Sequence, residues 1–209
     1  MTIALPKGRL YDKTSALLAQ CDYNLTLSDR QLVAEESRGR LRAILVKNSD
    51  LPTYVHNGIA GLGVCGTDVI YESGYEFHEL LTLPYGRTRI CLAGKPEENA
   101  HQDDQGTVLT VATKFPRFTR SFFHQRGIAV SVIKLNGSVE LAPVLGLAPY
   151  IVDLVETGST LKAHNLVVHE TLGETDVRLI ANPAFYKYHY RIVDQFVEQL
   201  RHVLESGTA

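Results

Sequence analysis

The stretch from Val152 to Leu161, VDLVETGSTL, joins an apolar run to small and hydroxyl-bearing residues. The run predicts a strand that ends at Thr157-Gly158-Ser159-Thr160 and leads into a helix. Glycine permits backbone conformations that aim successive N–H groups at one point, and the start of a helix offers more donors. Hydroxyl groups can donate as well. The stretch therefore predicts a cradle for an anion such as a phosphate.

Two carboxylates in the same stretch, Asp153 and Glu156, would repel a bare phosphate. An ionised carboxylate accepts hydrogen bonds from hydroxyl groups, so both residues fit a ligand that carries a polyol beside its phosphate. The combination favours a ribose 5-phosphate. The alternative, a capped helix start with a surface carboxylate, stays open because short Gly/Ser/Thr turns are common.

Several stretches form a pattern together: ALPKGRL at 4–10, SDLPTYV at 49–55 with Gly58, Gly63, Gly66 and Asp68 after it, ATKFP at 112–116, SVELAP at 138–143, GLA at 146–148 and 151–163. This pattern resembles that of the ATP phosphoribosyltransferases, which catalyse the first step of histidine biosynthesis. The stretches occur in the same order as in that family and extend over most of the chain. The chain departs from the family pattern at Lys47, Gly61 and Pro149, and also at His164 in the stretch after the turn.

The resemblance implies a reaction and a fold. The enzyme would join C1 of phosphoribosyl pyrophosphate to N1 of ATP and release pyrophosphate, with Mg²⁺ carried mainly by the substrate pyrophosphate. The length of 209 residues indicates the short form of the family. Short forms resemble two-lobed, periplasmic-binding-protein-like (type II) catalytic cores. They work with a regulatory subunit that resembles histidyl-tRNA synthetase, and we expect a homodimer within a hetero-oligomer.

The resemblance also assigns residues to ligands. Phosphoribosyl pyrophosphate is assigned Asp153, Glu156, Thr157, Gly158, Ser159, Thr160 and Glu140. The catalytic groups that grip pyrophosphate or triphosphate are Lys7, Arg9 and Arg30. The nucleotide is assigned Ser49 and Asp50, with Gly63, Cys65, Gly66 and Thr67 as a backbone wall for the adenine. Apart from the resemblance, Lys114 and Arg117 flank a helix start at Pro116 and could hold the ATP phosphates. We expect no metal ligand set made by the protein alone.

Simpler structural roles remain open for many of these residues. Lys7 and Arg9 could be a surface pair at a helix start, and Arg30 a solvated charge. Glu140 could cap or pack a helix. The glycine-rich 63–67 segment could be ordinary strand–turn–helix packing.

Strands that alternate with helices must position these groups. Strands are expected at 3–5, 41–46, 61–65, 77–83, 89–93, 107–112, 128–133, 150–155, 166–168 and 177–180. Helices are expected at 8–20, from Ser49 with Pro52 in its first turn, at 67–72, 116–125 and 138–145 with Ser138 as cap, and from Asn182 onward. This alternation predicts an α/β fold with mostly parallel sheets flanked by helices. We expect lobe I at 1–93 and 180–209, with the last helix packed on it, and lobe II with the phosphate cradle at 94–179.

Composition limits the classes of function. The net charge of −2 gives no reason to expect binding to nucleic acid or a membrane surface. Cys21, Cys65 and Cys91 are far apart, which indicates reduced thiols in a cytoplasmic protein. His164 and His169 are five residues apart, so a zinc site on one helix face is not expected. The chain shows no apolar run of membrane-spanning length.

Two other functions stay open at this point. The first is a small-ligand-binding module of the same two-lobed fold, because fold does not determine function. The second is a base-salvage phosphoribosyltransferase, which has a similar acidic strand followed by a TGxT turn. That second family usually has two adjacent carboxylates, whereas Val152 precedes Asp153 here.

Overall fold

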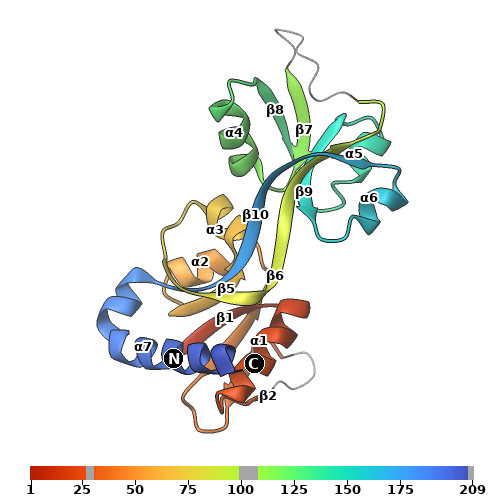
Figure 1. The fold of residues 1–209 in the computed structure, drawn as a ribbon. Coiled ribbons are helices and arrows are strands. Elements are labelled where there is room, and N and C mark those ends of the chain that lie inside the picture. The colour runs from red at the N-terminus through yellow and green to blue at the C-terminus, as the bar shows by residue number, and fades with distance from the viewer. Residues whose placement is uncertain (27–30, 99–107, 207–209) are drawn as a thin grey trace. The chain divides into compact units, whose positions relative to one another are not determined.

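The computed structural model describes residues 1–26, 31–98 and 108–206. The chain forms two compact units. Unit 1 comprises Met1–Gly86 and the chain from Asp176 onward, and unit 2 comprises Arg87–Thr175. Strands β6 (His78–Gly94) and β10 (Val167–Ala181) carry the chain from one unit to the other (Figure 1). The boundaries expected from the sequence, 93/94 and 179/180, lie within these same two strands.

Unit 1 is built on the strand order β2-β3-β4-β1-β5-β10. Its elements besides β6 and β10 are β1 (Thr2–Pro6), α1 (Arg9–Gln20), β2 (Leu25–Thr26), β3 (Val33–Glu36), β4 (Arg42–Val46), α2 (Leu51–His56), β5 (Leu62–Gly66), α3 (Thr67–Ser73) and α7 (Pro183–Ser206). Strands β4, β1 and β5 are parallel, so their carboxyl ends share one edge of the sheet.

The alternation of side chains along β1 sorts the helices of unit 1 onto two faces. Ile3 and Leu5 pack in one core with residues of α1 and α7. Ala4, between them, packs in a second core with α2. Successive side chains of a strand point to opposite faces, so α1 and α7 cover one face, and α2 covers the other.

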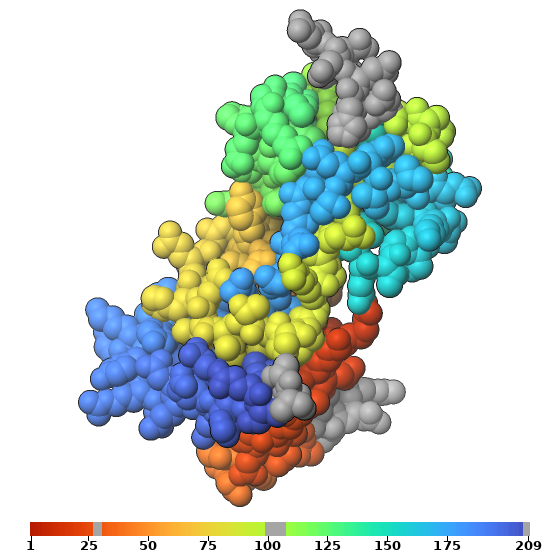
Figure 2. All heavy atoms as spheres, viewed as in Figure 1, coloured from red at the N-terminus to blue at the C-terminus, as the bar shows by residue number. Residues whose placement is uncertain are grey.

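Helix α7 packs on unit 1, as expected from the sequence. Its buried residues Val193, Phe196, Val197 and Leu200 join the core that contains α1. The blue side chains of α7 lie against the rest of unit 1 in Figure 2. At the start of the helix, the Asn182 side chain accepts a hydrogen bond from the Phe185 N–H at 2.9 Å. An asparagine in this position satisfies a backbone donor that has no partner within the helix.

Unit 2 is built on the strand order β6-β9-β7-β8. Its elements are β7 (Leu109–Thr113), α4 (Pro116–Gln125), β8 (Val130–Lys134), α5 (Leu141–Val144), β9 (Tyr150–Val155) and α6 (Ser159–Ala163), with parts of β6 and β10. Helix α4 packs in one core and helices α5 and α6 in another. Strands β7, β8 and β9 are parallel. The α/β class is confirmed, and antiparallel pairs made by β3, β6 and β10 make the sheet mixed.

Two expected pairs of short strands are wrong, because each pair is one long strand. The strands expected at 77–83 and 89–93 form β6, of 17 residues. Gly86 lies inside β6 with φ 75°, a conformation that bends a strand without ending it. The strands expected at 166–168 and 177–180 form β10, of 15 residues. The polar residues between the apolar runs continue the strand and do not form a loop.

Two expected helix caps are also absent. Ser138 has φ 48° and makes no side-chain capping bond, and α5 covers only four residues. The helix ends before Gly146, which adopts a left-handed conformation. At α2 the proline lies in the first turn as expected, but Asp50 makes no side-chain capping bond. The Ser49 hydroxyl donates to the Asp50 carboxylate at 3.0 Å.

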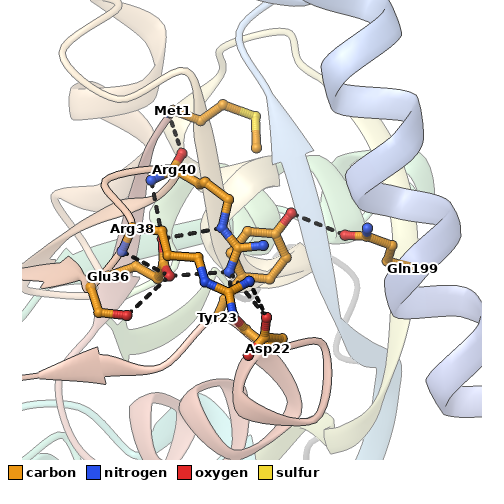
Figure 3. Close-up of polar contacts among 8 residues, drawn as sticks. Met1, Asp22, Tyr23, Glu36, Arg38, Arg40 and Gln199 are labelled. Atoms are coloured by element: carbon orange, nitrogen blue, oxygen red, sulfur yellow. Dashed lines mark hydrogen bonds and ion pairs between the residues drawn. The ribbon is translucent and has the colours of Figure 1, made fainter.

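A buried carboxylate organises the turn between β3 and β4 (Figure 3). Glu36 accepts hydrogen bonds from the backbone N–H groups of Arg38 and Arg40, each at 3.1 Å, and from the Arg40 guanidinium at 3.0 Å. The Arg40 guanidinium lies 4.5 Å from the centre of the Tyr23 ring. Tyr23 donates to the Gln199 side chain of α7 at 3.0 Å. The network therefore joins the turn to α7.

Candidate active site

The anion cradle predicted from the sequence lies at the end of β9 in unit 2. Val155 is buried, and the next two residues are exposed. Gly158 has φ 76° and ψ 6° and precedes the first residue of α6. The hydroxyls of Thr157 and Ser159 are 3.1 Å apart, and the Ser159 N–H lies 3.4 Å from the Thr157 hydroxyl oxygen. The turn thus places hydroxyl donors and a left-handed glycine together on the surface, which is the geometry that an anion site needs.

A second feature of unit 2 is an ion pair between neighbouring strands. Lys114 follows β7, and its ammonium lies 3.1 Å from Oδ1 of Asp153 on β9. The two strands are parallel, and Thr113 is paired with Val152. Lys114 and Asp153 therefore each follow the last paired residues of the two strands. The Asp153 side chain is 20% exposed, so the carboxylate is only partly open to solvent.

Thr113 fixes the backbone that carries Lys114. Its side chain is fully buried. The hydroxyl donates to the Val152 carbonyl at 2.7 Å and accepts from the Phe115 N–H at 2.9 Å. The turn after β7 is thereby tied to β9 one residue before Asp153. Thr113 belongs to the ATKFP stretch, but the sequence predicted no role for it; a Thr beside a basic residue at the end of a predicted strand was the available signal.

Glu140, assigned to phosphoribosyl pyrophosphate by resemblance, lies in the same unit. It immediately precedes α5 and is half-buried. Helix α5 packs against β9. The Glu140 side chain makes no capping hydrogen bond, so the structure does not support the alternative in which Glu140 caps the helix.

In unit 1 the candidate residues gather at the carboxyl ends of three parallel strands. Lys7 and Arg9 follow β1, Ser49 and Asp50 follow β4, and Thr67 follows β5. Gly8, between the two basic residues, has φ 88°, which only glycine adopts easily. Ligands of open α/β sheets bind outside the carboxyl ends of the strands, so this edge is a candidate binding surface. Arg30 lies outside the residues that the structure describes.

The glycine-rich part of the nucleotide assignment is tightly packed. A Cβ atom at Gly63 would lie 2.7 Å from Val55 and 2.9 Å from Leu51, both on α2. The side chain of Cys65 is fully buried, and burial raises the pKa of its thiol. These residues hold α2 against β5, and their contact with a nucleotide stays a prediction.

The next two residues close the end of β5. A Cβ atom at Gly66 would meet the carboxylate of Asp68. The Thr67 hydroxyl accepts a hydrogen bond from the Asp176 N–H on β10 at 3.1 Å. A hydroxyl that accepts one bond can still donate its own hydrogen, so Thr67 remains suited to a ligand.

The structure thus divides the candidate residues between the two units. Lys114, predicted from its place at a helix start to hold the ATP phosphates, lies in unit 2 beside Asp153, as do the cradle residues. The other described nucleotide residues and the pair Lys7 and Arg9 lie in unit 1.

None of the described helices has the length and apolar character needed to cross a membrane.

The arrangement of strands and helices defines a class of α/β protein that includes periplasmic ligand-binding proteins. The periplasmic aliphatic sulphonate-binding protein SsuA from Escherichia coli matches with a TM-score of 0.62 and 10% identity, over 97% of this chain and 72% of that one. At such low identity the likeness shows the fold alone. The expected periplasmic-binding-protein-like class is confirmed.

Within that class, comparisons at higher identity point to one family. Residues 47–202 match the family model described as ATP phosphoribosyltransferase. The ATP phosphoribosyltransferase of Caldanaerobacter subterraneus subsp. tengcongensis is 41% identical over 99% of both chains. A chain of the ATP phosphoribosyl transferase (HisG:HisZ) complex from Thermotoga maritima matches with a TM-score of 0.86 and 32% identity, over 99% of each chain.

This chain belongs to the ATP phosphoribosyltransferase family. The family resemblance found in the sequence is confirmed, and so are the enzyme class, a pentosyltransferase, and the step, the first of histidine biosynthesis.

Proposed function

We propose that the chain transfers the phosphoribosyl group of phosphoribosyl pyrophosphate to N1 of ATP through the residues described above. A bond forms between N1 and C1 of the ribose, and the bond between C1 and the pyrophosphate oxygen breaks. The observation that carries the proposal is the turn at Gly158, with Asp153 on the strand that leads to it, in a chain of this family.

The cradle binds the 5′-phosphate of the donor substrate. The N–H groups and hydroxyls from Thr157 to Thr160 supply donors, and the left-handed conformation of Gly158 lets them converge. Asp153 and Glu156 accept hydrogen bonds from the ribose hydroxyls. Glu140, immediately before α5, is proposed to bind phosphoribosyl pyrophosphate together with these residues.

Charge that develops on the departing pyrophosphate is the main barrier that the protein must lower. N1 of adenine already carries a lone pair, so attack on C1 requires no prior removal of a proton. Lys7 and Arg9, at the turn after β1, are proposed to hold the pyrophosphate or triphosphate oxygens, together with Arg30. Cations positioned in advance stabilise such charge without reorganisation during the reaction, and the planar guanidinium of Arg9 suits two parallel contacts to phosphate.

The nucleotide is assigned to the candidate edge of unit 1. Ser49, Asp50 and Thr67 offer side-chain donors and acceptors there, and Gly63, Cys65 and Gly66 form the packed backbone behind them. This assignment extends the family resemblance to individual residues.

Mg²⁺ is proposed to accompany the pyrophosphate. Mg²⁺ usually keeps several waters and binds through one or two carboxylates together with substrate phosphates. Asp153 on β9 and Glu156 just after it are proposed to accept hydrogen bonds from the ribose hydroxyls, so the ion would be carried mainly by the substrate pyrophosphate. When bound, the ion would neutralise charge on the leaving group.

A regulatory partner is also proposed. The Thermotoga maritima relative is described as a HisG:HisZ complex, which supports a second, histidyl-tRNA-synthetase-like subunit for this chain. We propose a homodimer within such a hetero-oligomer, acting in the cytoplasm.

The test is an assay of the purified chain with ATP, phosphoribosyl pyrophosphate and Mg²⁺, following the ultraviolet change of an N1-substituted adenosine. Pyrophosphatase draws the reaction forward, and parallel samples contain or lack the regulatory subunit. Turnover that requires both substrates supports the proposal. Turnover with free purine or pyrimidine bases in place of ATP would overturn the assignment of the acceptor.

A further inference from the structure

The two oxygens of the Asp153 carboxylate have different surroundings. Oδ1 lies 3.1 Å from the Lys114 ammonium and accepts a hydrogen bond from the Leu154 N–H at 2.7 Å. Within the described part of the chain, no hydrogen bond or ion pair reaches Oδ2. One oxygen is therefore held by the protein, and the other remains available as an acceptor.

We propose that Lys114 is a positioning residue that fixes the Asp153 carboxylate so that Oδ2 meets the hydroxyls of the bound ribose. This inference rests on the proposed function and deepens it, because it moves Lys114 from the ATP phosphates to the phosphoribosyl site. Lys114 acts through Asp153 and makes no contact of its own with the sugar.

The fixed backbone on both sides of Lys114 makes this role possible. A lysine is long and loses side-chain entropy when it is held in one place. Here the backbone on both sides is fixed, because the buried Thr113 hydroxyl bonds to the Val152 carbonyl and to the Phe115 N–H. The Lys114 ammonium also lies 5.7 Å from the centre of the Phe115 ring. The position from which Lys114 reaches Asp153 is thus set by β9 itself.

The competing explanation is that Lys114 binds a phosphate of the substrate directly. In that case the Asp153 pair would break when the ligand binds, and the two residues would contribute independently. The two explanations differ in additivity, since residues that act as one unit show non-additive effects in a double-mutant cycle.

Calorimetry with phosphoribosyl pyrophosphate therefore compares the wild type, Lys114→Met, Asp153→Asn and the double variant. A hydrogen bond to a charged group contributes about 1.5–3 kcal/mol, so each single variant should bind about 10- to 100-fold more weakly. In the double variant, Lys114→Met should add less than about threefold to the effect of Asp153→Asn. Effects that multiply would overturn the proposal.

Inorganic phosphate serves as a second probe, because it lacks hydroxyl groups. Its inhibition constant against phosphoribosyl pyrophosphate should be the same for Lys114→Met and the wild type, and a marked rise would assign Lys114 to the phosphate. Lys114→Arg, which keeps the charge, should restore most of the lost affinity. Lys134→Met is the matched control, because Lys134 is exposed at the end of the neighbouring strand β8, and it should bind normally.

The outcome separates this inference from the proposed function. A wild type that binds no phosphoribosyl pyrophosphate overturns both. A wild type that binds it, with multiplying effects of the two substitutions, overturns only the role of Lys114. Circular dichroism of all variants confirms that each one is folded.

Discussion

At the residue scale, Thr157 and Gly61 illustrate two ways in which a single position matters. Thr157 is exposed, and its hydroxyl is 3.1 Å from that of Ser159 in the cradle. Gly61 is buried, and a Cβ atom there would lie 2.5 Å from the ring of Phe185. Thr157 is proposed to contact the ligand, whereas Gly61 lies in the packed interior, so substitutions at the two positions should have separate effects.

We expect Thr157→Leu to weaken phosphoribosyl pyrophosphate binding by about 10- to 100-fold, because it removes a hydroxyl donor to a charged group and adds bulk to the cradle. The melting temperature should change little, since the side chain is exposed. Calorimetry and thermal unfolding measure the two quantities. Thr82→Leu, at an exposed position of β6, is the control. Unchanged affinity in Thr157→Leu would remove Thr157 from the cradle.

Gly61→Ala should lower the free energy of unfolding by about 1–3 kcal/mol, because the added methyl group displaces Phe185. The cost should be smaller when Phe185 is replaced by alanine, which leaves room for the methyl group. Urea unfolding of the two single variants and the double variant measures the coupling. Gly137→Ala is the control, because a Cβ atom at Gly137 meets nothing within 4 Å. Equal costs in both backgrounds would contradict the proposed contact.

At the element scale, the turn between β3 and β4 depends on one ionised side chain. Glu36 accepts bonds from two backbone N–H groups of the turn and from the Arg40 guanidinium. These bonds lower the pKa of Glu36 to about 2, with the side-chain bond from Arg40 as the largest cause. Through Arg40 and Tyr23 the same turn is connected to α7. Protonation of Glu36 should therefore loosen contacts well beyond the turn.

The lowered pKa of Glu36 makes the free energy of unfolding larger at neutral pH than at acidic pH. A carboxyl group with a folded pKa near 2 stabilises the protein fully above its usual value of 4.5, and this contribution is lost as the pH falls from there toward 2. Glu36→Gln should be less stable than the wild type at pH 7, and the difference should shrink between pH 5 and pH 3. Urea unfolding at a series of pH values measures this. A difference that is constant with pH would show that Glu36 is not the group that titrates.

At the scale of the whole molecule, the proposed ligands are distributed over two units. The residues proposed for the ribose 5-phosphate lie in unit 2, and those proposed for the nucleotide, except Lys114, lie in unit 1. Unit 2 is inserted into unit 1, since unit 1 begins before it and ends after it. Each unit has its own cores, so each can respond to its own ligand.

Hydrogen exchange followed by mass spectrometry should report this division. Ribose 5-phosphate, which lacks pyrophosphate, should slow exchange at 156–162 and leave the turns after β1, β4 and β5 unchanged. ATP should slow exchange at those turns of unit 1. The second half of α7, at 195–206, serves as a control that neither ligand protects. Protection of unit 1 alone by ribose 5-phosphate would contradict the assignment of the cradle.

The sequence predicted the elements with strong local signals. The helix at Pro116–Gln125 and the strand at Tyr150–Val155 have the expected bounds, because a proline in the first turn and a compact apolar run each mark a boundary. The sequence pattern predicted two short strands in place of each of β6 and β10, because turn-forming and polar residues interrupt the apolar runs. The sheet accommodates these residues within one continuous strand. The turn at Gly158 before α6 could also be predicted from local spacing, and its role as an anion cradle stays a prediction.

Contacts between distant residues could not be predicted in the same way. Lys114 and Asp153 are 39 positions apart, and their ion pair depends on the register of β7 against β9. The residue pattern within a single strand carries no information about that register. The fit of Phe185 over Gly61 depends on where α7 begins relative to β5. It accounts for glycine at position 61, where the chain departs from the family pattern.

The insertion of unit 2 has a consequence for how the protein is made. The core of unit 1 includes Val177 and Leu179 of β10 and Phe196 of α7, which leave the ribosome after all of unit 2. Unit 2 is continuous from Arg87 to Thr175, so it can fold while those residues are still being synthesised. During translation the nascent chain therefore carries an incomplete first unit, in which Ile3 and Leu5 have α1 beside them but lack the cover of α7, until β10 and α7 are synthesised.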